Sequence, residues 1–306
     1  MNRARSFGIA VCAASLAVAL GVLTLVAVDA PESYLRVNIV ALAASLLFGA
    51  LLLVNRKLLT RGLGIIALTG GAAILATAFL GEPLEGVRRW VRAGPLLLHV
   101  GMVVMPFILA RAVSRTDGLS VFAVTLALLG AALQPDAAIA TALAGGAVIL
   151  AAVRSSRVAW GVAGLAVMAC VWCWAQPDPL PAVKYVEGVL PLAFRQTTAA
   201  GVLASVALAM PILALVGYGT FVAPRRVLAF VLAAAWTGLS AAALFGKYPT
   251  PLVGYGFSPI LSYVLCWTVL VAAPAMDQPK SARRIFNDGS NGSVSSPSTS
   301  TTTRSI

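Results

Sequence analysis

The sequence is built from long apolar runs that contain no charged residue, such as 9–28 and 227–245. Each run can cross the hydrocarbon core of a bilayer, because a membrane-spanning α-helix needs about 20 apolar residues. A transmembrane β-barrel would instead need strands of about ten residues in which apolar and polar side chains alternate. Because the runs here do not alternate, they favour membrane-spanning helices over a barrel.

The low charge content argues against a soluble protein of this length. Only 10% of the 306 residues are charged, whereas soluble domains carry about 25% charged residues. So few charges cannot cover a globular surface in water, and lipid is therefore the expected solvent. We predict an all-α, polytopic integral membrane protein with about ten transmembrane helices.

The apolar runs also define the domain organisation. Charges, prolines and glycines separate these predicted spans: 7–28, 35–54, 62–81, 95–113, 119–134, 137–153, 157–175, 198–218, 226–245 and 257–275. They fill a predicted transmembrane domain of residues 1–276. Residues 277–306 are rich in Ser, Thr, Asn, Gly and Pro, and a segment of this composition is predicted to be a disordered tail because it cannot bury a core.

The charged residues between the spans give the orientation. With ten spans, 15 of the 22 Lys and Arg residues and three acidic residues lie on the side of the N-terminus, which therefore carries +12. The opposite side has seven basic and seven acidic residues and a net charge of zero. Basic loops stay in the cytoplasm, so both termini are predicted to be cytoplasmic. The basic loops are expected to face anionic membrane lipids, and no nucleic-acid partner is indicated.

Several arginines on the outer side depart from this charge rule. They stand together before the fourth span, as Arg88, Arg89 and Arg92. Guanidinium groups bind phosphate oxygens in a forked geometry, so this segment is a candidate anion site, with Trp90 anchored at the headgroup level. Pairing of the arginines with Glu82 and Glu85, or with lipid phosphates, is the equally weighted alternative.

The longest outer segment, 176–195, holds the candidate general base. Glu187 lies there in an apolar stretch, after a proline-rich start that contains Asp178. A carboxylate among apolar residues near a membrane has a raised pKa, as a general base requires. The alternative is a surface Glu187 that pairs with Lys184 or Arg195.

Other polar features of the outer half allow a structural and a functional interpretation. The turn 134–136 places Asp136 where it would either cap the next helix or contribute to a site. The last outer segment, 246–259, is rich in Gly and Pro, which indicates non-helical backbone that is packed in protein or lines a cavity. His99, early in the fourth span, is expected to be a satisfied core histidine rather than a proton relay.

In their order along the chain, these outer segments resemble the SEDS family of bacterial FtsW, RodA and SpoVE proteins. Residues 86–90 with 94–95 resemble the family's Gly-Ala-x-Arg-Trp-Ile … Leu-Gly-Pro segment. Residues 133–136 resemble its Gln-Pro-Asp segment, and 249–258 resemble its Pro-Leu-Pro-Phe-x-Ser-Tyr-Gly-Gly-Ser segment. The resemblance covers about residues 1–275 and implies ten helices with the largest outer loop after the seventh.

The resemblance also implies a function. Family members polymerise peptidoglycan glycan strands from lipid II, usually with a penicillin-binding protein as partner. When 180–187 is laid on the family's Leu-Pro-x-x-His-Thr-Asp-Phe segment with one extra residue, Glu187 stands for the essential Asp, and Asp178 is the second candidate base. Arg88, Arg89 or Arg92 would then neutralise the pyrophosphate. The residues expected to line the cavity are Trp90, Gln134, Asp136, Tyr255 and Ser258.

The resemblance leaves three functions open. The chain is either a peptidoglycan glycosyltransferase, a non-catalytic scaffold or precursor-binding protein, or a flippase or transporter of lipid-linked sugars. In each case it would lie in the bacterial inner membrane, with a penicillin-binding protein or another divisome or elongasome component as the candidate partner. The spacing of Cys170 and Cys173 is not followed by a second ligand pair, so no metal site is predicted. No cofactor is indicated, although a divalent cation is compatible with pyrophosphate chemistry.

Overall fold

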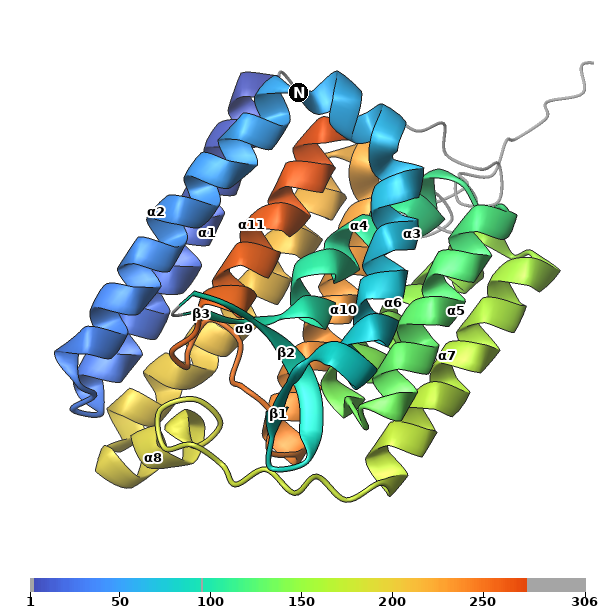
Figure 1. The fold of residues 1–306 in the computed structure, drawn as a ribbon. Helices are drawn as coiled ribbons and strands as arrows, with labels where there is room; N and C mark the ends of the chain where they lie inside the picture. Colours follow the sequence, from blue (N-terminus) through green and yellow to red (C-terminus); the bar gives the residue numbers. More distant parts are fainter. Residues whose placement is uncertain (1–2, 95, 274–306) are drawn as a thin grey trace, which may run out of the picture.

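The computed structural model describes residues 3–94 and 96–273, which form a bundle of long helices (Figure 1). The helices that correspond to the predicted spans are α1 (Arg3–Ala27), α2 (Glu32–Val54), α3 (Arg56–Leu80), α4 (Val100–Ser114), α5 (Gly118–Leu133), α6 (Ala137–Arg154), α7 (Arg157–Ala175), α9 (Thr198–Phe221), α10 (Arg226–Phe245) and α11 (Phe257–Ala272). The predicted polytopic, helical membrane fold is therefore confirmed. The predicted tail, 277–306, lies outside the described residues.

The helices fall into two groups by length. Seven of those in the described part of the chain are long and apolar enough to cross a membrane, while α4, α5 and α11 have only 15 or 16 residues. The shorter α4 and α11 begin below the outer end of the bundle, where non-helical segments replace their first turns. This irregular backbone forms the candidate site.

Lipid-facing and central helices differ in burial. Only 22% of the most apolar window of α2 and of α7 is buried, against 67% for α6 and 61% for α10. The central pair packs closely, because a Cβ atom added to Gly238 in α10 would lie 2.8 Å from the backbone of Ala142 in α6. Small residues at such contacts let membrane helices approach each other and gain van der Waals energy.

A small antiparallel sheet interrupts the helical pattern at the outer end (Figure 1). Its strands, in spatial order, are β1 (Glu82–Leu84), β2 (Val87–Ala93) and β3 (Leu96–His99). The predicted fourth span is therefore wrong at its start, since residues 96–99 form a strand and the helix begins at Val100. His99 ends the strand and caps α4, because its Nδ1 accepts the N–H of Met102 at 3.3 Å.

The turn chemistry explains this sheet. Glu85 and Gly86 join β1 to β2 in a two-residue turn, with φ angles of +46° and +89°. Two positive φ angles match the twist of a tight β-hairpin, and glycine adopts such an angle without strain. Val87, Trp90 and Val91 then favour an extended strand because β-branched and aromatic side chains fit a pleated surface.

The longest outer segment crosses the same end of the bundle. It contains a short helix, α8 (Val189–Gln196), which lies beside the outer ends of α1 and α9 (Figure 1). The sequence analysis did not predict this helix. Its apolar side is anchored by Val189 and Ala193, which are fully buried against α1 and α9. The segment is therefore fixed to the bundle on both sides of Glu187.

Candidate functional site

A cavity of about 370 Å³ opens at the outer end of the bundle, and we call it the outer cavity. The β2–β3 ribbon, the longest outer segment and the start of α11 together line it. Among the lining residues are Trp90, His99, Glu187, Tyr255 and Ser258. Three segments far apart in the sequence thus meet around one carboxylate, and the cavity size is typical of ligand sites.

Backbone hydrogen bonds join two of these segments. The N–H of Thr250 donates to the carbonyl of Val186 at 3.0 Å, and the N–H of Tyr255 donates to the carbonyl of Tyr185 at 3.0 Å. A Cβ atom added to Gly254 would lie 2.6 Å from the Val186 oxygen. Glycine is therefore needed at position 254 for the two segments to approach, and this approach fixes the backbone next to Glu187.

Asn38 supports the same region from α2. It is fully buried, its Oδ1 accepts the N–H of Gly256 at 3.0 Å, and its Nδ2 donates to the carbonyl of Gly254 at 3.4 Å. Tyr34, one turn earlier, stacks on Tyr255 with ring centroids 4.1 Å apart. Sequence reasoning missed both residues, although an amide inside an apolar span is a signal because polar groups in lipid need partners.

Glu187 presents its carboxylate to the outer cavity. Its Oε2 accepts the N–H of Val183 at 2.8 Å. Burial raises the pKa of Glu187, and the nearby Asp178 raises it further, which together outweigh the lowering by backbone N–H groups. Within residues 3–94 and 96–273, no Lys or Arg forms an ion pair with Glu187.

The alternative pairing partners of Glu187 are engaged elsewhere. The ammonium group of Lys184 lies 4.8 Å from the centre of the Tyr185 ring. The Nε of Arg195 donates to the carbonyl of Pro191 at 3.3 Å, within α8. The structure thus favours a carboxylate that faces the cavity over a neutralised surface Glu.

Arg89 lies on the other side of the β-ribbon, in a buried group that we call the Arg89 cluster. The cluster consists of Arg89, Gln134, Pro135, Asp178 and Tyr248. The Nη1 of Arg89 contacts Asp178 Oδ2 at 2.9 Å, and its Nη2 donates to the Pro135 carbonyl at 2.8 Å. Its Nε donates to the Gln134 carbonyl at 3.4 Å, and its guanidinium carbon lies 5.1 Å from the centre of the Tyr248 ring.

This cluster holds the outer turn in place. The hydroxyl of Tyr248 donates to the Pro135 carbonyl at 3.2 Å and accepts the N–H of Ala137 at 3.1 Å. The Nε2 of Gln134 donates to the Ile74 carbonyl at 2.5 Å. Arg89 itself has only 2% of its side chain exposed. Its donors therefore satisfy turn carbonyls and a carboxylate, and they do not face the outer cavity.

Asp136 caps α6, as the structural alternative predicted. Its Oδ1 accepts the N–H of Ile139 at 3.1 Å, while its Oδ2 lies 3.3 Å from His99 Nε2 without hydrogen-bond alignment. Burial raises the pKa of Asp136, but His99, Arg89 and the Ile139 N–H together lower it below the ordinary value. Asp136 is therefore held as an anion inside the protein.

His99 connects the outer cavity with the buried acid. Because its Nδ1 accepts the Met102 N–H, the ring proton is assigned to Nε2, which faces Asp136. The backbone N–H of His99 donates to Ser258 Oγ at 2.8 Å, and its ring meets Trp90 edge to face at 5.6 Å. Nδ1 accepts a hydrogen bond and Nε2 faces the Asp136 carboxylate, so the geometry matches the expected core histidine.

The three predicted phosphate-binding arginines are not brought together on the outer cavity. Arg88 donates from Nη1 to the Gly81 carbonyl at 2.9 Å, and Arg92 pairs with Glu82 at 2.7 Å. The hydrogen bond from Arg92 lowers the pKa of Glu82. None of the three lines the cavity, so their binding of pyrophosphate stays a prediction, and the alternative of local partners matches the geometry.

Strand alternation nevertheless separates these arginines. Successive side chains of a strand point to opposite faces, which puts Arg88 and Arg92 on the face of Trp90, while Arg89 points into the bundle. Trp90 lines the outer cavity, and Arg92 is 53% exposed beside it along the strand. Arg92 is thus the arginine best placed to reach a ligand at the mouth of the cavity.

The remaining predicted site residues also divide into two sets. Glu187, Trp90, Tyr255 and Ser258 line the outer cavity, whereas Gln134, Asp136 and Asp178 lie outside its lining. Asp178, the second candidate base, is engaged by Arg89 and also accepts the N–H of Leu180 at 3.2 Å. In the part of the chain that the structure describes, no group of three metal-ligating side chains occurs.

The fold is similar to that of solved bacterial membrane proteins. The rod shape determining protein RodA of Thermus thermophilus matches with a TM-score of 0.63 and 20% identity, over 86% of this chain and 94% of RodA. Its aspartate-to-alanine mutant matches with a TM-score of 0.65 and 18% identity, over 86% and 95% of the two chains. A chain of a peptidoglycan synthase complex matches with a TM-score of 0.56 and 21% identity, over 86% and 95%.

The likeness to these proteins is seen in the fold rather than in the sequence as a whole. No protein-family model matches the sequence, and no curated protein matches it significantly. The structural matches cover nearly the whole of each related chain. The SEDS-like fold expected from the outer segments is therefore confirmed.

Proposed function

We propose, on the premise that this chain has the RodA-like fold of SEDS proteins, that it serves bacterial cell-wall synthesis, cell division or cell shape. It would act in the bacterial inner membrane on a polyprenyl-pyrophosphate-linked sugar, with lipid II as the first candidate. The polyprenyl tail of such a ligand would stay in the bilayer while its headgroup entered the outer cavity. The fold and the convergence of the three outer segments support this proposal.

The reaction we propose is glycosyl transfer with Glu187 as general base. Glu187 would take the proton from a sugar hydroxyl while that oxygen forms a bond to the anomeric carbon of the donor. The bond from the anomeric carbon to the pyrophosphate oxygen would break, and the lipid pyrophosphate would leave with the electron pair. The product is a glycan longer by one unit and a protonated Glu187.

The observation that carries this proposal is the setting of Glu187. It is the acidic residue on the described wall of the outer cavity, it lacks an ion-pair partner there, and burial raises its pKa. A general base works best when its pKa lies near the working pH. The resemblance to the SEDS segment assigns the essential acid to the same position.

Arg92 is the cation that we propose for the leaving pyrophosphate. Its present partner, Glu82, is 31% exposed, and the pair lies at the surface. Exposed pairs contribute little to stability, so a phosphate group could replace Glu82 at small energetic cost. Arg89 would have to leave a buried carboxylate uncompensated, which is far more costly. No group of three metal-ligating side chains occurs among the described residues, so we assign no residue to hold a divalent cation.

Polymerisation of lipid II by the purified protein tests the enzyme proposal. Wild-type protein is expected to extend glycan strands, and Glu187→Gln is expected to reduce the rate by about 10²–10⁴-fold, the usual contribution of a general base. Glu32→Gln is the matched control, because Glu32 is an outer-face carboxylate that pairs with Arg36 and lies outside the cavity lining. Full activity of Glu187→Gln would exclude Glu187 as the base.

A non-catalytic function is the second candidate, and one observation favours it. No Lys or Arg lines the outer cavity within the described residues, so the pyrophosphate would meet no cation unless Arg92 moves. A scaffold or precursor-binding protein would bind lipid II without consuming it. Binding that is unaffected by Glu187→Gln, in a protein that forms no polymer, would support this candidate over the enzyme.

A partner protein is part of the proposal. One structural match is a chain of a peptidoglycan synthase complex that coordinates polymerization and crosslinking. By this likeness we propose a penicillin-binding protein, or another divisome or elongasome component, as the partner. Co-purification of the full-length chain with each penicillin-binding protein of the same organism tests this point, with an unrelated polytopic protein as the control.

A further inference from the structure

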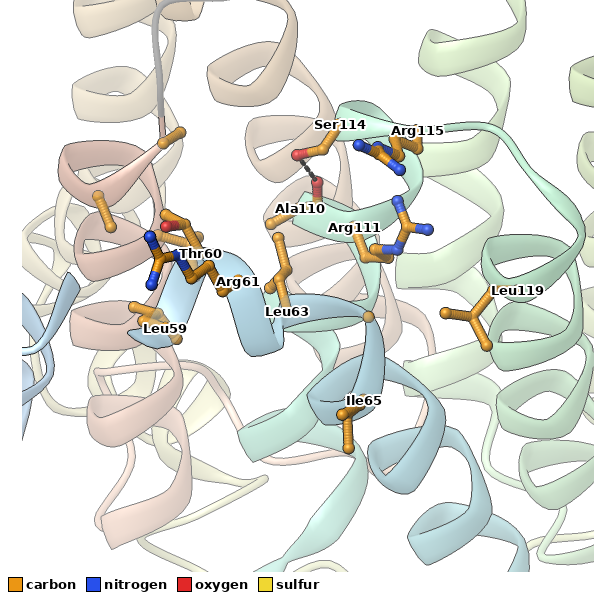
Figure 2. A pocket seen from close by; sticks show the side chains of 14 residues that line it. Leu59, Thr60, Arg61, Leu63, Ile65, Ala110, Arg111, Ser114, Arg115 and Leu119 are labelled. Atoms are coloured by element: carbon orange, nitrogen blue, oxygen red, sulfur yellow. Dashed lines mark hydrogen bonds between the residues drawn. The ribbon is translucent and has the colours of Figure 1, made fainter. Parts of the chain in front are cut away.

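A second cavity, of about 650 Å³, lies at the cytoplasmic end of the bundle, and we call it the inner cavity (Figure 2). It is formed by the first turns of α3 and the last turns of α4 and α11, with Leu119 of α5 at its edge. The outer cavity lies at the opposite ends of α4 and α11. The inner cavity therefore plays no part in the function proposed above.

The polar wall of the inner cavity is cationic. Its charged residues are Arg61, Arg111 and Arg115. Arg111 is only 7% exposed, and its Nη2 donates to Asp117 Oδ2 at 2.5 Å. Its Nε is buried and has no hydrogen-bond partner among the residues that the structure describes. A buried donor without an acceptor is costly, so this Nε indicates a missing ligand.

The space beside this Nε is kept open by a glycine. A Cβ atom added to Gly64 would lie 3.3 Å from Arg111 Nε and 2.9 Å from Leu119 Cδ2. Gly64 itself lines the inner cavity. The absence of a side chain at this position therefore leaves room beside the buried Nε at the wall of the cavity, which Arg111 lines.

The hydroxyl groups of the wall are already committed as donors. Ser114 Oγ donates to the Ala110 carbonyl at 2.7 Å (Figure 2), and Thr60 Oγ1 donates to the Arg56 carbonyl at 2.9 Å. The guanidinium groups of Arg61 and Arg115 form no hydrogen bond or ion pair within residues 3–94 and 96–273. Arginine donors are thus what the cavity offers to a ligand.

One of these three positive charges is balanced by Asp117. The pKa of Asp117 is lowered to about 2, because the N–H and hydroxyl of Ser120 and the guanidinium of Arg111 outweigh the effect of its partial burial. Asp117 is therefore ionised at neutral pH and neutralises one arginine. Two uncompensated arginines remain, which favours an anionic ligand.

The rest of the lining is apolar and reaches the lipid-facing surface. It includes Leu59, Leu63, Ile65, Leu119 and Val269. Ile65 is 70% exposed and Leu119 is 37% exposed, as expected for side chains that contact lipid tails. The cavity thus joins a cationic end at headgroup depth to an apolar opening toward the bilayer, which matches an amphipathic ligand.

We propose that the inner cavity binds the phosphate headgroup of an anionic phospholipid of the cytoplasmic leaflet. Arg61 and Arg115 would bind the phosphate oxygens, and Arg111 would turn its unpartnered Nε toward the ligand. The first part of the acyl chains would lie along the apolar wall. Guanidinium groups suit this role because they bind phosphate in a forked geometry, and basic pockets between membrane helices bind lipid headgroups.

Native mass spectrometry of the purified full-length protein in neutral detergent tests the proposal, with phosphatidylglycerol as the probe. The wild type is expected to retain phosphatidylglycerol in preference to phosphatidylcholine. The double variant Arg61→Gln/Arg115→Gln is expected to bind phosphatidylglycerol at least about tenfold more weakly, as the loss of charge-assisted hydrogen bonds implies. Arg157→Gln is the matched control, because Arg157 begins α7 on the same side and is exposed outside the cavity.

A variant that preserves all charges makes the test sharper. Gly64→Ala places a methyl group against Arg111 Nε and should weaken phosphatidylglycerol binding several-fold. Gly62→Ala is its control on the same helix, because the nearest atom to a Cβ there is Ile66 Cδ1 at 3.8 Å. Equal binding by the two alanine variants, or by the double variant and Arg157→Gln, would overturn the proposal.

The source of the phosphate is tested in the same experiment. Inorganic phosphate or pyrophosphate is expected to displace phosphatidylglycerol poorly, because neither fills the apolar wall. Displacement by inorganic phosphate at concentrations similar to the lipid would overturn the lipid assignment and indicate a soluble anion. Each outcome is independent of glycan polymerisation, so failure of the outer-cavity function leaves this result unaffected.

Discussion

The Arg89 cluster and the outer cavity lie on two faces of one β-ribbon, yet the carboxylate in the cluster is paired with a cation and the carboxylate in the cavity is not. In the cluster, Asp178 contacts Arg89 at 2.9 Å and has only 15% of its side chain exposed. In the cavity, Glu187 accepts the backbone N–H of Val183 and has no cation within ion-pair distance in the described chain. The charge of Asp178 is therefore neutralised inside the protein, whereas Glu187 has no cationic partner among the described residues.

This difference distinguishes acidic residues that stabilise the fold from an acidic residue that could react, although the sequence alone does not tell them apart. Asp178 has both carboxylate oxygens engaged, by Arg89 and by the Leu180 N–H, and Asp136 is fully buried and caps α6 through Oδ1, so both acids hold backbone in place. A half-buried acid that faces a cavity is partly removed from water. This desolvation raises its pKa, as is common for acids at functional sites. The comparison therefore favours a structural role for Asp178 and Asp136, and it leaves Glu187 as the proposed functional acid.

Breaking the buried pair is the largest expected stability effect. Arg89→Gln leaves Asp178 as an uncompensated buried charge and should cost about 3–5 kcal/mol of unfolding free energy. The measurement is denaturant unfolding in detergent. The double variant Arg89→Met/Asp178→Leu, which removes both charges, should recover much of the loss. A stability loss below about 1 kcal/mol in Arg89→Gln would show that the pair is not structural.

The next largest loss of stability is expected at the contact between the outer segments 176–195 and 246–259. Gly254→Ala places a methyl group 2.6 Å from the Val186 oxygen, and overpacking of this kind costs about 1–3 kcal/mol. The displaced backbone should also reduce the activity of Glu187, which follows Val186 directly. Gly256→Ala is the matched control for the stability loss alone, since a Cβ atom there meets only Pro259 Cδ at 3.6 Å but lies on the wall of the outer cavity. Equal stability losses from the two substitutions would contradict the proposed role of Gly254.

The sequence predicted the helical membrane fold well for a physical reason. Apolar runs, charge asymmetry and span length are properties of single segments, and the bilayer imposes them locally. The strand at residues 96–99 was not predicted, because an apolar segment of four residues fits a strand or a helix equally well. Gly86 was the available signal for the ribbon, since glycine adopts the positive φ angle that a two-residue hairpin turn requires.

The candidate site was only partly predictable. Trp90, Glu187, Tyr255 and Ser258 were assigned to one cavity from short motifs, and the structure places all four on its wall. The partner of each arginine depended on contacts between distant segments, such as Arg89 with Asp178, which no local pattern encodes. Strand alternation within 88–92 would have separated Arg89 from its neighbours, had the strand been recognised.

The pH dependence of stability sharpens the contrast between the two acids. The pKa of Glu187 is raised in the folded protein, so its protonated form is favoured there. Its stabilising contribution is present below the unfolded pKa and is lost as pH rises through the folded pKa. Wild-type protein should therefore lose Tm relative to Glu187→Gln as pH rises above about 4.5, the ordinary value for Glu. Parallel Tm curves for the two proteins across this range would contradict a buried, unpaired Glu187.

The exposed pair of Arg92 and Glu82 gives the smallest stability effect and the most specific functional one. Arg92→Gln should leave Tm unchanged, because ion pairs open to water contribute little to folding. If Arg92 turns toward a bound pyrophosphate, the same substitution should lower kcat/KM for lipid II by about tenfold, which corresponds to the loss of one charge-assisted hydrogen bond. Arg88→Gln is the control, since Arg88 shares the ribbon face but donates to the Gly81 carbonyl. Equal kcat/KM values for Arg92→Gln and the wild type would leave the outer cavity without a protein cation, and the precursor-binding function would then be favoured over catalysis.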